Sequence, residues 1–133
     1  MKKTALILFG LTAFMSCHES IEDRALREAR EYTEKFCPTP VINYTRTDSV
    51  TFDKATKTYN YYCSVTDMMD NQKIIRTNSN NIKEGLLQSI KQNTEIRTYK
   101  KAGFTFAYTI YSSKKPGFVY LKISFSPRDY NEE

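Results

Sequence analysis

Apolar residues recur at helical spacing soon after an initial apolar run. Ile21, Ala25 and Ala29 lie on one face of a helix that we predict over residues 20–36, with charged residues on the opposite face. Ser20 precedes this face as a candidate N-cap. Two prolines follow the last apolar position, and the residue before a proline avoids the helical region, so the helix ends there.

Strict alternation of apolar and polar residues predicts two β-hairpins further along the chain. The first pairs a strand around Val50 and Phe52 with a strand over residues 59–65. The second pairs residues 104–110 with residues 119–125. Each strand has an apolar side, which predicts a sheet with one face against a core.

The segment between the hairpins predicts helices rather than strands. Residues 66–71 are expected as a loop and residues 72–76 as a short extension. A helix begins at Asn80 or Asn81, because its apolar residues recur at helical spacing up to position 90. A further short helix follows Thr94.

The order of these elements predicts the fold class. Helix, hairpin, helices and hairpin suit a two-layer α+β domain, in which the two hairpins join into a four-stranded antiparallel sheet with helices packed on one face. We expect this single domain to span residues 20–127, with residues 128–133 as an acidic tail.

The first residues have the features of an export signal. Two lysines precede a run of about 12 mostly apolar residues, which is too short to span a bilayer. Phe14-Met15-Ser16-Cys17 resembles the lipobox of bacterial lipoproteins. The resemblance implies cleavage after residue 16, lipidation of Cys17, and a tether over residues 17–19. The alternative is an ordinary secretory signal with an incidental cysteine.

The resemblance also implies a location. His18 rather than aspartate follows Cys17, which in such lipoproteins favours anchoring in the outer membrane, on the periplasmic side or at the cell surface. Two or more acyl chains, palmitate being typical, give a stable membrane anchor. The mature domain is similar in general character to small uncharacterised lipoproteins of gut Gram-negative bacteria.

Charge gives little indication of a nucleic-acid partner. The formal net charge of the chain is +5, and removal of Lys2 and Lys3 with the signal leaves +3. Arg97, Lys100, Lys101, Lys114 and Lys115 form a local basic excess, which we interpret as a solvated surface rather than an anion site. We therefore expect no nucleic-acid partner.

Two cysteines remain after Cys17. An even pair in an exported protein predicts a disulfide between Cys37 and Cys63, and two buried free thiols are the alternative. A metal site is not expected, because His18 is the only histidine and lies in the tether.

Catalytic chemistry is poorly supported by the sequence. No histidine lies within the folded region to activate a serine or cysteine. Asp67 and Asp70 could in principle act together, but they lack the spacing of a metal-binding loop. We predict no cofactor, no metal and no enzymatic activity.

Aromatic residues provide the candidate binding surface. By strand alternation, Tyr62, Phe118 and Tyr120 point away from the helix-covered face and would form a patch on the open face. Cross-strand pairing that only stabilises the sheet is the alternative. The sequence thus predicts a membrane-anchored envelope module that binds a protein or a glycan, with an enzyme or inhibitor of envelope components as the alternative.

Overall fold

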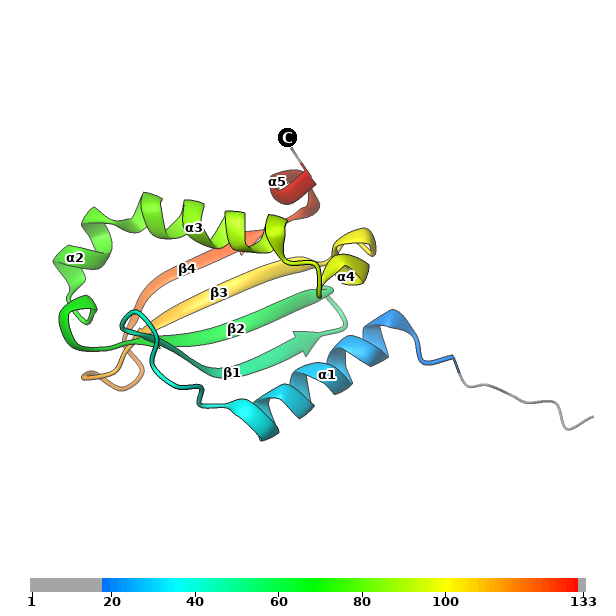
Figure 1. Ribbon diagram of the computed structural model, residues 1–133, viewed down its shortest axis with the longest axis horizontal. Coiled ribbons are helices and arrows are strands. Elements are labelled where there is room, and N and C mark those ends of the chain that lie inside the picture. Colours follow the sequence, from blue (N-terminus) through cyan, green and yellow to red (C-terminus); the bar gives the residue numbers. More distant parts are fainter. Residues whose placement is uncertain (1–17, 132–133) are drawn as a thin grey trace, which may run out of the picture.

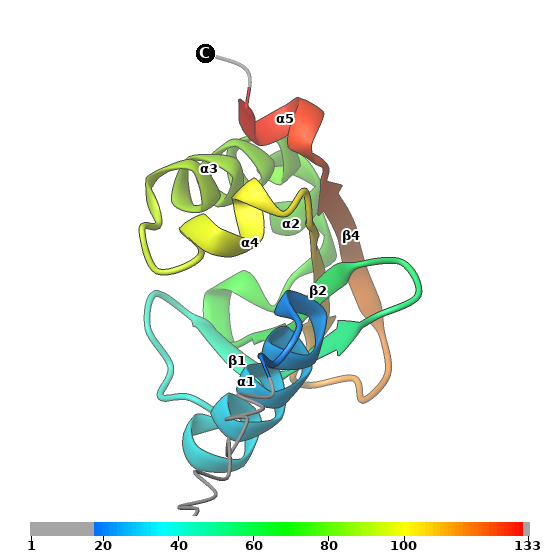
Figure 2. The same ribbon diagram turned by 90° about the vertical axis from the view of Figure 1, so that its right-hand side faces the viewer.

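Four strands form one sheet in the order β1-β2-β3-β4, and helices lie against one of its faces (Figure 1). The structure is a computed structural model that describes residues 18–131. Figure 2 shows the helices on one side of the sheet and its other face bare. The predicted α+β class and the α-ββ-α-ββ order are confirmed. The strands are β1 (Thr45–Asp53), β2 (Thr58–Val65), β3 (Thr105–Ser112) and β4 (Val119–Phe125).

The sheet is mixed, so the prediction of a fully antiparallel sheet is wrong. Both hairpins form, but β2 pairs with β3 in parallel, with Tyr61 opposite Tyr108 and Val65 opposite Ser112. Parallel neighbours need a long crossover connection, usually helical. Residues 66–104 supply it, and their helices return the chain to the end of the sheet where β2 began.

Helix α1 (Ile21–Phe36) forms as predicted and lies along the edge strand β1. The Ser20 hydroxyl accepts a hydrogen bond from the Asp23 amide, which confirms the N-cap. Ala25 and Ala29 are buried, and their small side chains allow close packing. The Thr33 hydroxyl donates to the Val50 carbonyl at 2.8 Å and accepts from the Val50 amide at 2.9 Å. These two bonds fix the helix to the β1 backbone.

The crossover contains more helix than the pattern predicted. After a short 3-10 turn, η1 (Asp67–Met69), come α2 (Gln72–Thr77), α3 (Ser79–Gln92) and α4 (Arg97–Lys101). The expected extension over residues 72–76 is wrong, because the Asn71 side chain caps α2 by accepting from the Lys73 and Ile74 amides. Helix α3 begins slightly earlier than Asn80.

The described part of the chain ends in a packed helix, although we expected an acidic tail over residues 128–133. Helix α5 (Pro127–Asn131) buries Tyr130, whose hydroxyl donates to the Phe104 carbonyl at 2.7 Å. Its ring meets the Phe106 ring edge-on. The last residues of the described chain therefore belong to the domain.

The core consists of two clusters at opposite ends of the helix-covered face. The larger cluster packs α1, α3, α4 and α5 on the sheet around Phe104, Phe106 and Phe125. The smaller one joins Val65, Ile75 and Ile110. Between α1 and α3 no helix crosses the sheet in the ribbon view (Figure 1), and a pocket lies over this part of it.

The predicted signal peptide and Cys17 lie outside the described residues. Within residues 18–131, no helix has the length and apolar character needed to cross a membrane.

Candidate binding groove

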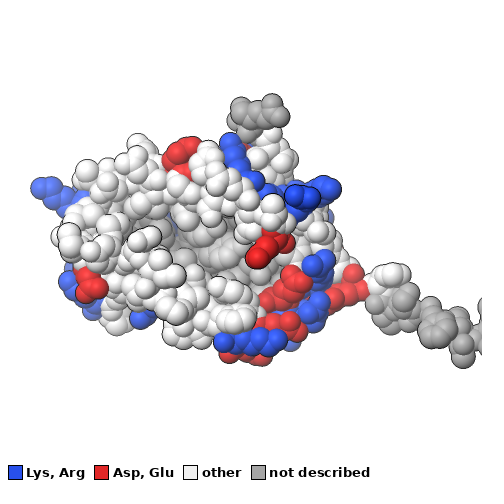
Figure 3. Space-filling model, in the orientation of Figure 1, with Lys and Arg blue, Asp and Glu red and all other residues white. Residues whose placement is uncertain are grey.

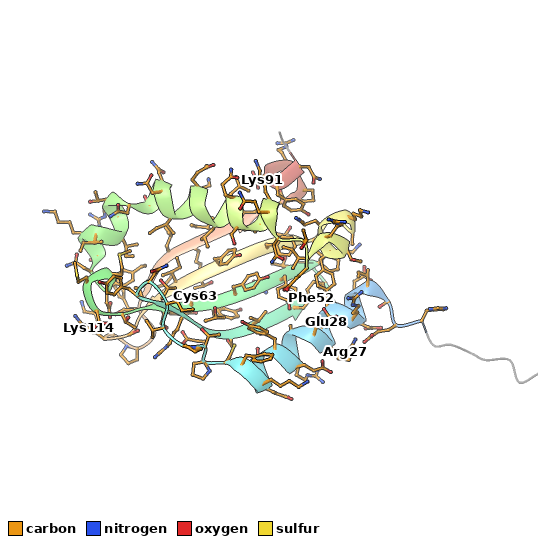
Figure 4. The ribbon with its side chains drawn as sticks, viewed as in Figure 1. Arg27, Glu28, Phe52, Cys63, Lys91 and Lys114 are labelled. Atoms are coloured by element: carbon orange, nitrogen blue, oxygen red, sulfur yellow. The ribbon has the colours of Figure 1, made fainter. Side chains whose placement is uncertain are left out.

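A groove runs over the sheet between α1 and α3, and we call it the central groove. Tyr61, Cys63 and Tyr108 form its floor, and Leu86 and Ser89 of α3 form one wall. Thr45 and Thr47 of β1 line the opposite side, and the enclosed volume is about 400 Å³. Figure 3 shows this hollow in the face, with mostly uncharged residues around it and acidic residues toward its right-hand end. Figure 4 shows Cys63 on the floor between the two helices.

The floor of the groove depends on the parallel pairing of β2 and β3. This pairing sets Tyr61 directly opposite Tyr108. Their rings stack with centroids 4.7 Å apart and planes inclined by 12°. Neighbouring side chains on one sheet face pack in this way when both rings share an apolar surface. The stacked pair gives the groove a flat and rigid aromatic base.

A second hollow of about 300 Å³ continues the groove toward α4 and shares Tyr61 and Asn93 with it. Here Glu28 of α1 accepts a hydrogen bond from the Tyr99 hydroxyl and forms an ion pair with Arg24. Burial would raise the pKa of Glu28, but these bonds lower it overall. Glu28 therefore stays ionised at this end of the groove, paired with Arg24 (Figure 4).

Exposed apolar side chains border the groove on the α1 side. Phe36 is 60% exposed and Ile42 is 69% exposed, and both line a shallow hollow with Tyr32 and Thr47. Val41 is also exposed. Contiguous apolar residues of this kind mark interaction surfaces more often than isolated ones do. We call Tyr32, Phe36, Val41 and Ile42 the apolar rim.

The α3 wall offers polar groups to an occupant of the groove. Ser89 and Asn93 lie one helical turn apart and both line it. Within residues 18–131, neither the Ser89 hydroxyl nor the Asn93 side-chain nitrogen makes a hydrogen bond, whereas the Asn93 side-chain oxygen accepts from the Glu95 amide. The groove thus combines an apolar floor with available donors along one wall.

The ionisable groups of the floor are held in their neutral forms. Burial raises the pKa of Tyr61 and of Tyr108 well above the usual value. Burial also raises the pKa of the Cys63 thiol. A thiol becomes a good nucleophile only when its pKa is lowered. The floor is therefore suited to contact rather than to acid–base or nucleophilic chemistry.

Cys37 and Cys63 are free thiols in the structure, so the expected disulfide does not form in it. Cys37 ends α1 and is partly exposed, whereas Cys63 is buried in the sheet and approaches the Thr47 hydroxyl at 4.0 Å. The alternative of two buried free thiols fits Cys63 but not Cys37, which is partly exposed.

The three aromatic residues of the predicted binding face do not come together. Tyr62 lies on the open face, where it pairs with Ser49 and Thr109. Phe118 and Tyr120 contact each other instead beside α2, in a separate cleft. A β-bulge explains the difference: Ile110 pairs with Leu121 but Tyr111 pairs with Val119, which leaves Tyr120 as the extra residue. Simple alternation therefore fails at Tyr120.

The two aspartates considered for catalysis are also separated. Asp67 is exposed in η1, whereas Asp70 is buried and hydrogen-bonded by Ser112 and Tyr120. Within the described part of the chain, no group of three or more metal-binding side chains occurs. Asp70 thus has a structural position rather than that of an acid–base pair with Asp67.

The local basic excess is divided between two parts of the fold. The Lys100 side chain donates to the Ile90 and Lys91 carbonyls and so caps the end of α3. Arg97 and Lys101 lie on the exposed side of α4. Lys114 and Lys115 lie at the distant β3–β4 turn, so these five residues form no single patch.

Sequence reasoning missed the central groove because it depends on the parallel crossover. One signal was available: Val41, Ile42 and Tyr44 are apolar or aromatic but belong to no predicted core face. Apolar residues without an assigned core position are candidates for a binding surface.

Comparison with known protein families assigns the chain to a family. Residues 20–121 match the family described as Domain of unknown function (DUF8479), and the chain belongs to that family. No curated protein matches the chain.

Solved structures with the same fold come from two bacterial genera. A Pseudomonas aeruginosa protein assigned as secreted aligns with a TM-score of 0.69 at 16% identity, over 82% of this chain and 91% of its own. The type II secretion system pilotin AspS from Vibrio cholerae aligns at 0.61 and 12% identity, over 81% and 90%. The type 2 secretion system pilotin EpsS from Vibrio vulnificus aligns at 0.57 and 9% identity, over 84% and 93%. These likenesses establish a shared fold.

Proposed function

We propose that this member of the DUF8479 family is a lipid-anchored, non-catalytic module of the bacterial envelope that binds a segment of another envelope protein in the central groove. The observation that carries the proposal is the open groove itself. A folded domain ordinarily covers such an aromatic sheet surface, and here α1 and α3 leave it partly accessible.

The composition of the groove favours a polypeptide as its occupant. Tyr61 and Tyr108 offer an apolar base for side chains, while Ser89 and Asn93 offer hydrogen bonds to a backbone. An acyl chain would leave these polar groups without a partner, at a cost of about 1–3 kcal/mol for each group that it buries. A protein segment uses both kinds of surface.

The apolar rim supports a partner that extends beyond the groove. Phe36 and Ile42 are more than half exposed and lie next to the groove along α1 and the following loop. A few residues supply most of the binding energy at protein interfaces, and aromatic residues such as Phe are enriched there. A partner seated in the groove would bury these side chains as well.

The N-terminal sequence supports an envelope location. Phe14-Met15-Ser16-Cys17 resembles a lipobox, and His18 after it favours the outer membrane. Two or more acyl chains on Cys17 would hold the domain at the membrane surface. The fold likeness to two pilotins, together with a protein assigned as secreted, is in keeping with such a location.

A non-catalytic role follows from the chemistry of the groove. Its tyrosines and its thiol are kept neutral by burial, and general acid–base catalysis needs groups with a pKa near the working pH. An inhibitor of another envelope protein would use the same surface and falls within this proposal.

A blocking substitution tests the proposal. Ser89→Arg would put a long charged side chain into the groove from an exposed position on α3, so the fold should tolerate it. Gln88→Arg is the matched control, since Gln88 is exposed on the same helix and does not line the groove. Membrane co-purification should lose its partner with Ser89→Arg and keep it with Gln88→Arg. Equal recovery of the partner with both variants would refute the proposal.

A further inference from the structure

A second cleft lies beside α2, and it has a different chemical character. Lys73 and Arg76 of α2 form one wall, Lys114 and Lys115 of the β3–β4 turn form another, and Phe118 and Tyr120 complete it. We call it the basic cleft. Its volume is about 680 Å³, and it shares no lining residue with the central groove. Figure 4 shows Lys114 at the end of the molecule far from the N-terminus of α1.

None of the ion pairs among residues 18–131 involves the basic side chains of the cleft, which are those of Lys73, Arg76, Lys114 and Lys115. These ion pairs lie on α1, its approach and the β1–β2 hairpin. Like charges around one cavity repel each other and favour an anion between them. The carboxylate of Asp70 is the only acidic group among the residues that line the cleft.

Asp70 offsets one of the four positive charges of the cleft, and it also holds the walls of the cleft together. Its carboxylate accepts hydrogen bonds from the Ser112 hydroxyl at 2.6 Å, the Tyr120 hydroxyl at 2.7 Å and the Lys114 amide at 2.8 Å. These donors belong to β3, β4 and the turn between them. The Ser112 hydroxyl in turn accepts from the Lys115 amide at 3.0 Å. One buried carboxylate thus fixes the backbone that carries two of the cations.

An aromatic surface adjoins the cations. The Phe118 ring is 36% exposed and lies edge-on to the Tyr120 ring, with centroids 5.2 Å apart. The Lys115 ammonium group lies 5.5 Å from the Phe118 ring centroid. A bare phosphate ion would use only the cations. A ligand with a phosphate group and a ring that has an apolar C–H face, such as a sugar ring, would use both surfaces.

We propose that the basic cleft binds a phosphorylated saccharide, either free in solution or as the head group of a membrane glycolipid. The basic cleft is separate from the central groove. The saccharide would therefore be a second ligand of the protein, besides the envelope protein proposed to bind in the groove. This site also changes the interpretation of Lys114 and Lys115, which the sequence suggested to be a solvated hairpin tip. In the folded chain, Lys114 and Lys115 lie apart from Arg97 and Lys101 and line the same cleft as α2.

NMR titration of the full chain tests the proposal with defined probes. Glucose 1-phosphate should shift the Lys114 and Lys115 amides and bind at least about tenfold more tightly than glucose or inorganic phosphate. In a second arm, phosphatidylcholine vesicles containing lipopolysaccharide are compared with vesicles containing phosphatidylglycerol. Binding in the first arm alone indicates a free saccharide, and preference for lipopolysaccharide indicates a membrane source; either supports the site.

Matched variants locate the binding. Lys114→Gln with Lys115→Gln should weaken binding about tenfold or more, and Phe118→Ala should reduce the preference for glucose 1-phosphate over inorganic phosphate. Lys83→Gln with Lys122→Gln removes the same charge from exposed positions outside the cleft and should change binding by less than about twofold. Unchanged thermal unfolding confirms that each variant folds.

Three results would overturn the proposal. One is equal binding of inorganic phosphate and glucose 1-phosphate, which indicates an adventitious ion only. Another is equal loss of binding in the Lys83/Lys122 control. The third is tighter binding of a short single-stranded oligonucleotide than of either saccharide probe, which would assign the cleft to nucleic acid.

Discussion

The Tyr61 ring stacks on the Tyr108 ring across two parallel strands, and their centroids are 4.7 Å apart. This contact forms the base of the central groove and lies between the two central strands of the sheet. The two rings therefore link the stability of the domain to the shape of its proposed binding site.

Two substitutions of Tyr108 should separate the contribution of its ring to stability from that of its hydroxyl. Tyr108→Ala removes a large, mostly buried ring and should lower the free energy of unfolding by about 2–3 kcal/mol. Tyr108→Phe should change it by less than about 0.5 kcal/mol, because within residues 18–131 the hydroxyl makes no hydrogen bond. Urea unfolding of both variants measures the difference. A large loss with Tyr108→Phe would show that the hydroxyl, and not the stacking, supports the floor.

Asp70 should make the domain sensitive to acid. Burial alone would raise the pKa of Asp70, but hydrogen bonds from Ser112, Tyr120 and the Lys114 amide lower it to about 2. The folded pKa is below the unfolded value of about 3.9, so the ionised carboxylate stabilises the fold above about pH 4. This contribution, about 2 kcal/mol, is lost as the pH falls from about 4 toward 2.

The variant Asp70→Asn isolates this effect. Its free energy of unfolding should fall less steeply between about pH 4 and pH 2 than that of the parent protein. Asp67→Asn, at an exposed neighbouring position, should leave the slope unchanged. Chemical unfolding at a series of pH values provides the data, and identical slopes for the parent and Asp70→Asn would contradict the role of Asp70.

How far the sequence predicts this fold depends on the range of the interactions involved. Local signals were sufficient for α1, where Ser20 caps the helix and Ala25 and Ala29 mark its buried face. They were also sufficient for both hairpins. The parallel pairing of β2 and β3 is a long-range contact, and alternation within each strand contains no information about it.

The candidate site was less predictable for the same reason. Tyr120 points toward α2 because a β-bulge interrupts the alternation, and no residue in the sequence marks the bulge. The central groove arises from the spacing of α1 and α3 on the sheet, which neither helix determines by itself. Tyr130 joins the core through a short helix whose local sequence is mostly polar.

The two thiols of the domain should react at different rates. Cys37 is partly exposed and Cys63 is buried, and burial raises the pKa of both. Iodoacetamide should therefore modify Cys37 first, with Cys63 protected until the protein unfolds. Mass spectrometry of unreduced protein should find both Cys37 and Cys63 modified after denaturation. If neither is reactive before reduction, the two cysteines form the disulfide that the sequence suggested.

Lipidation at Cys17 is a separate prediction, because Cys17 lies outside the described residues. Cells that express the full chain should incorporate labelled palmitate into it, and Cys17→Ala should abolish the label and release the protein from the membrane fraction. Cys37→Ala serves as the control and should retain the label. Labelling that persists in Cys17→Ala would show that the anchor has another position or does not exist.

Site-specific photo-cross-linking in intact cells tests the central claim most directly. A photoreactive amino acid at Ser89 faces the groove, and the same amino acid at Gln88 faces away from it on the same helix. We predict that Ser89 forms a discrete cross-link to one envelope protein, that Gln88 does not, and that Leu86→Asp in the groove wall removes it. Cross-linking of the same protein from both positions, or from neither, would contradict a role for the groove in partner binding.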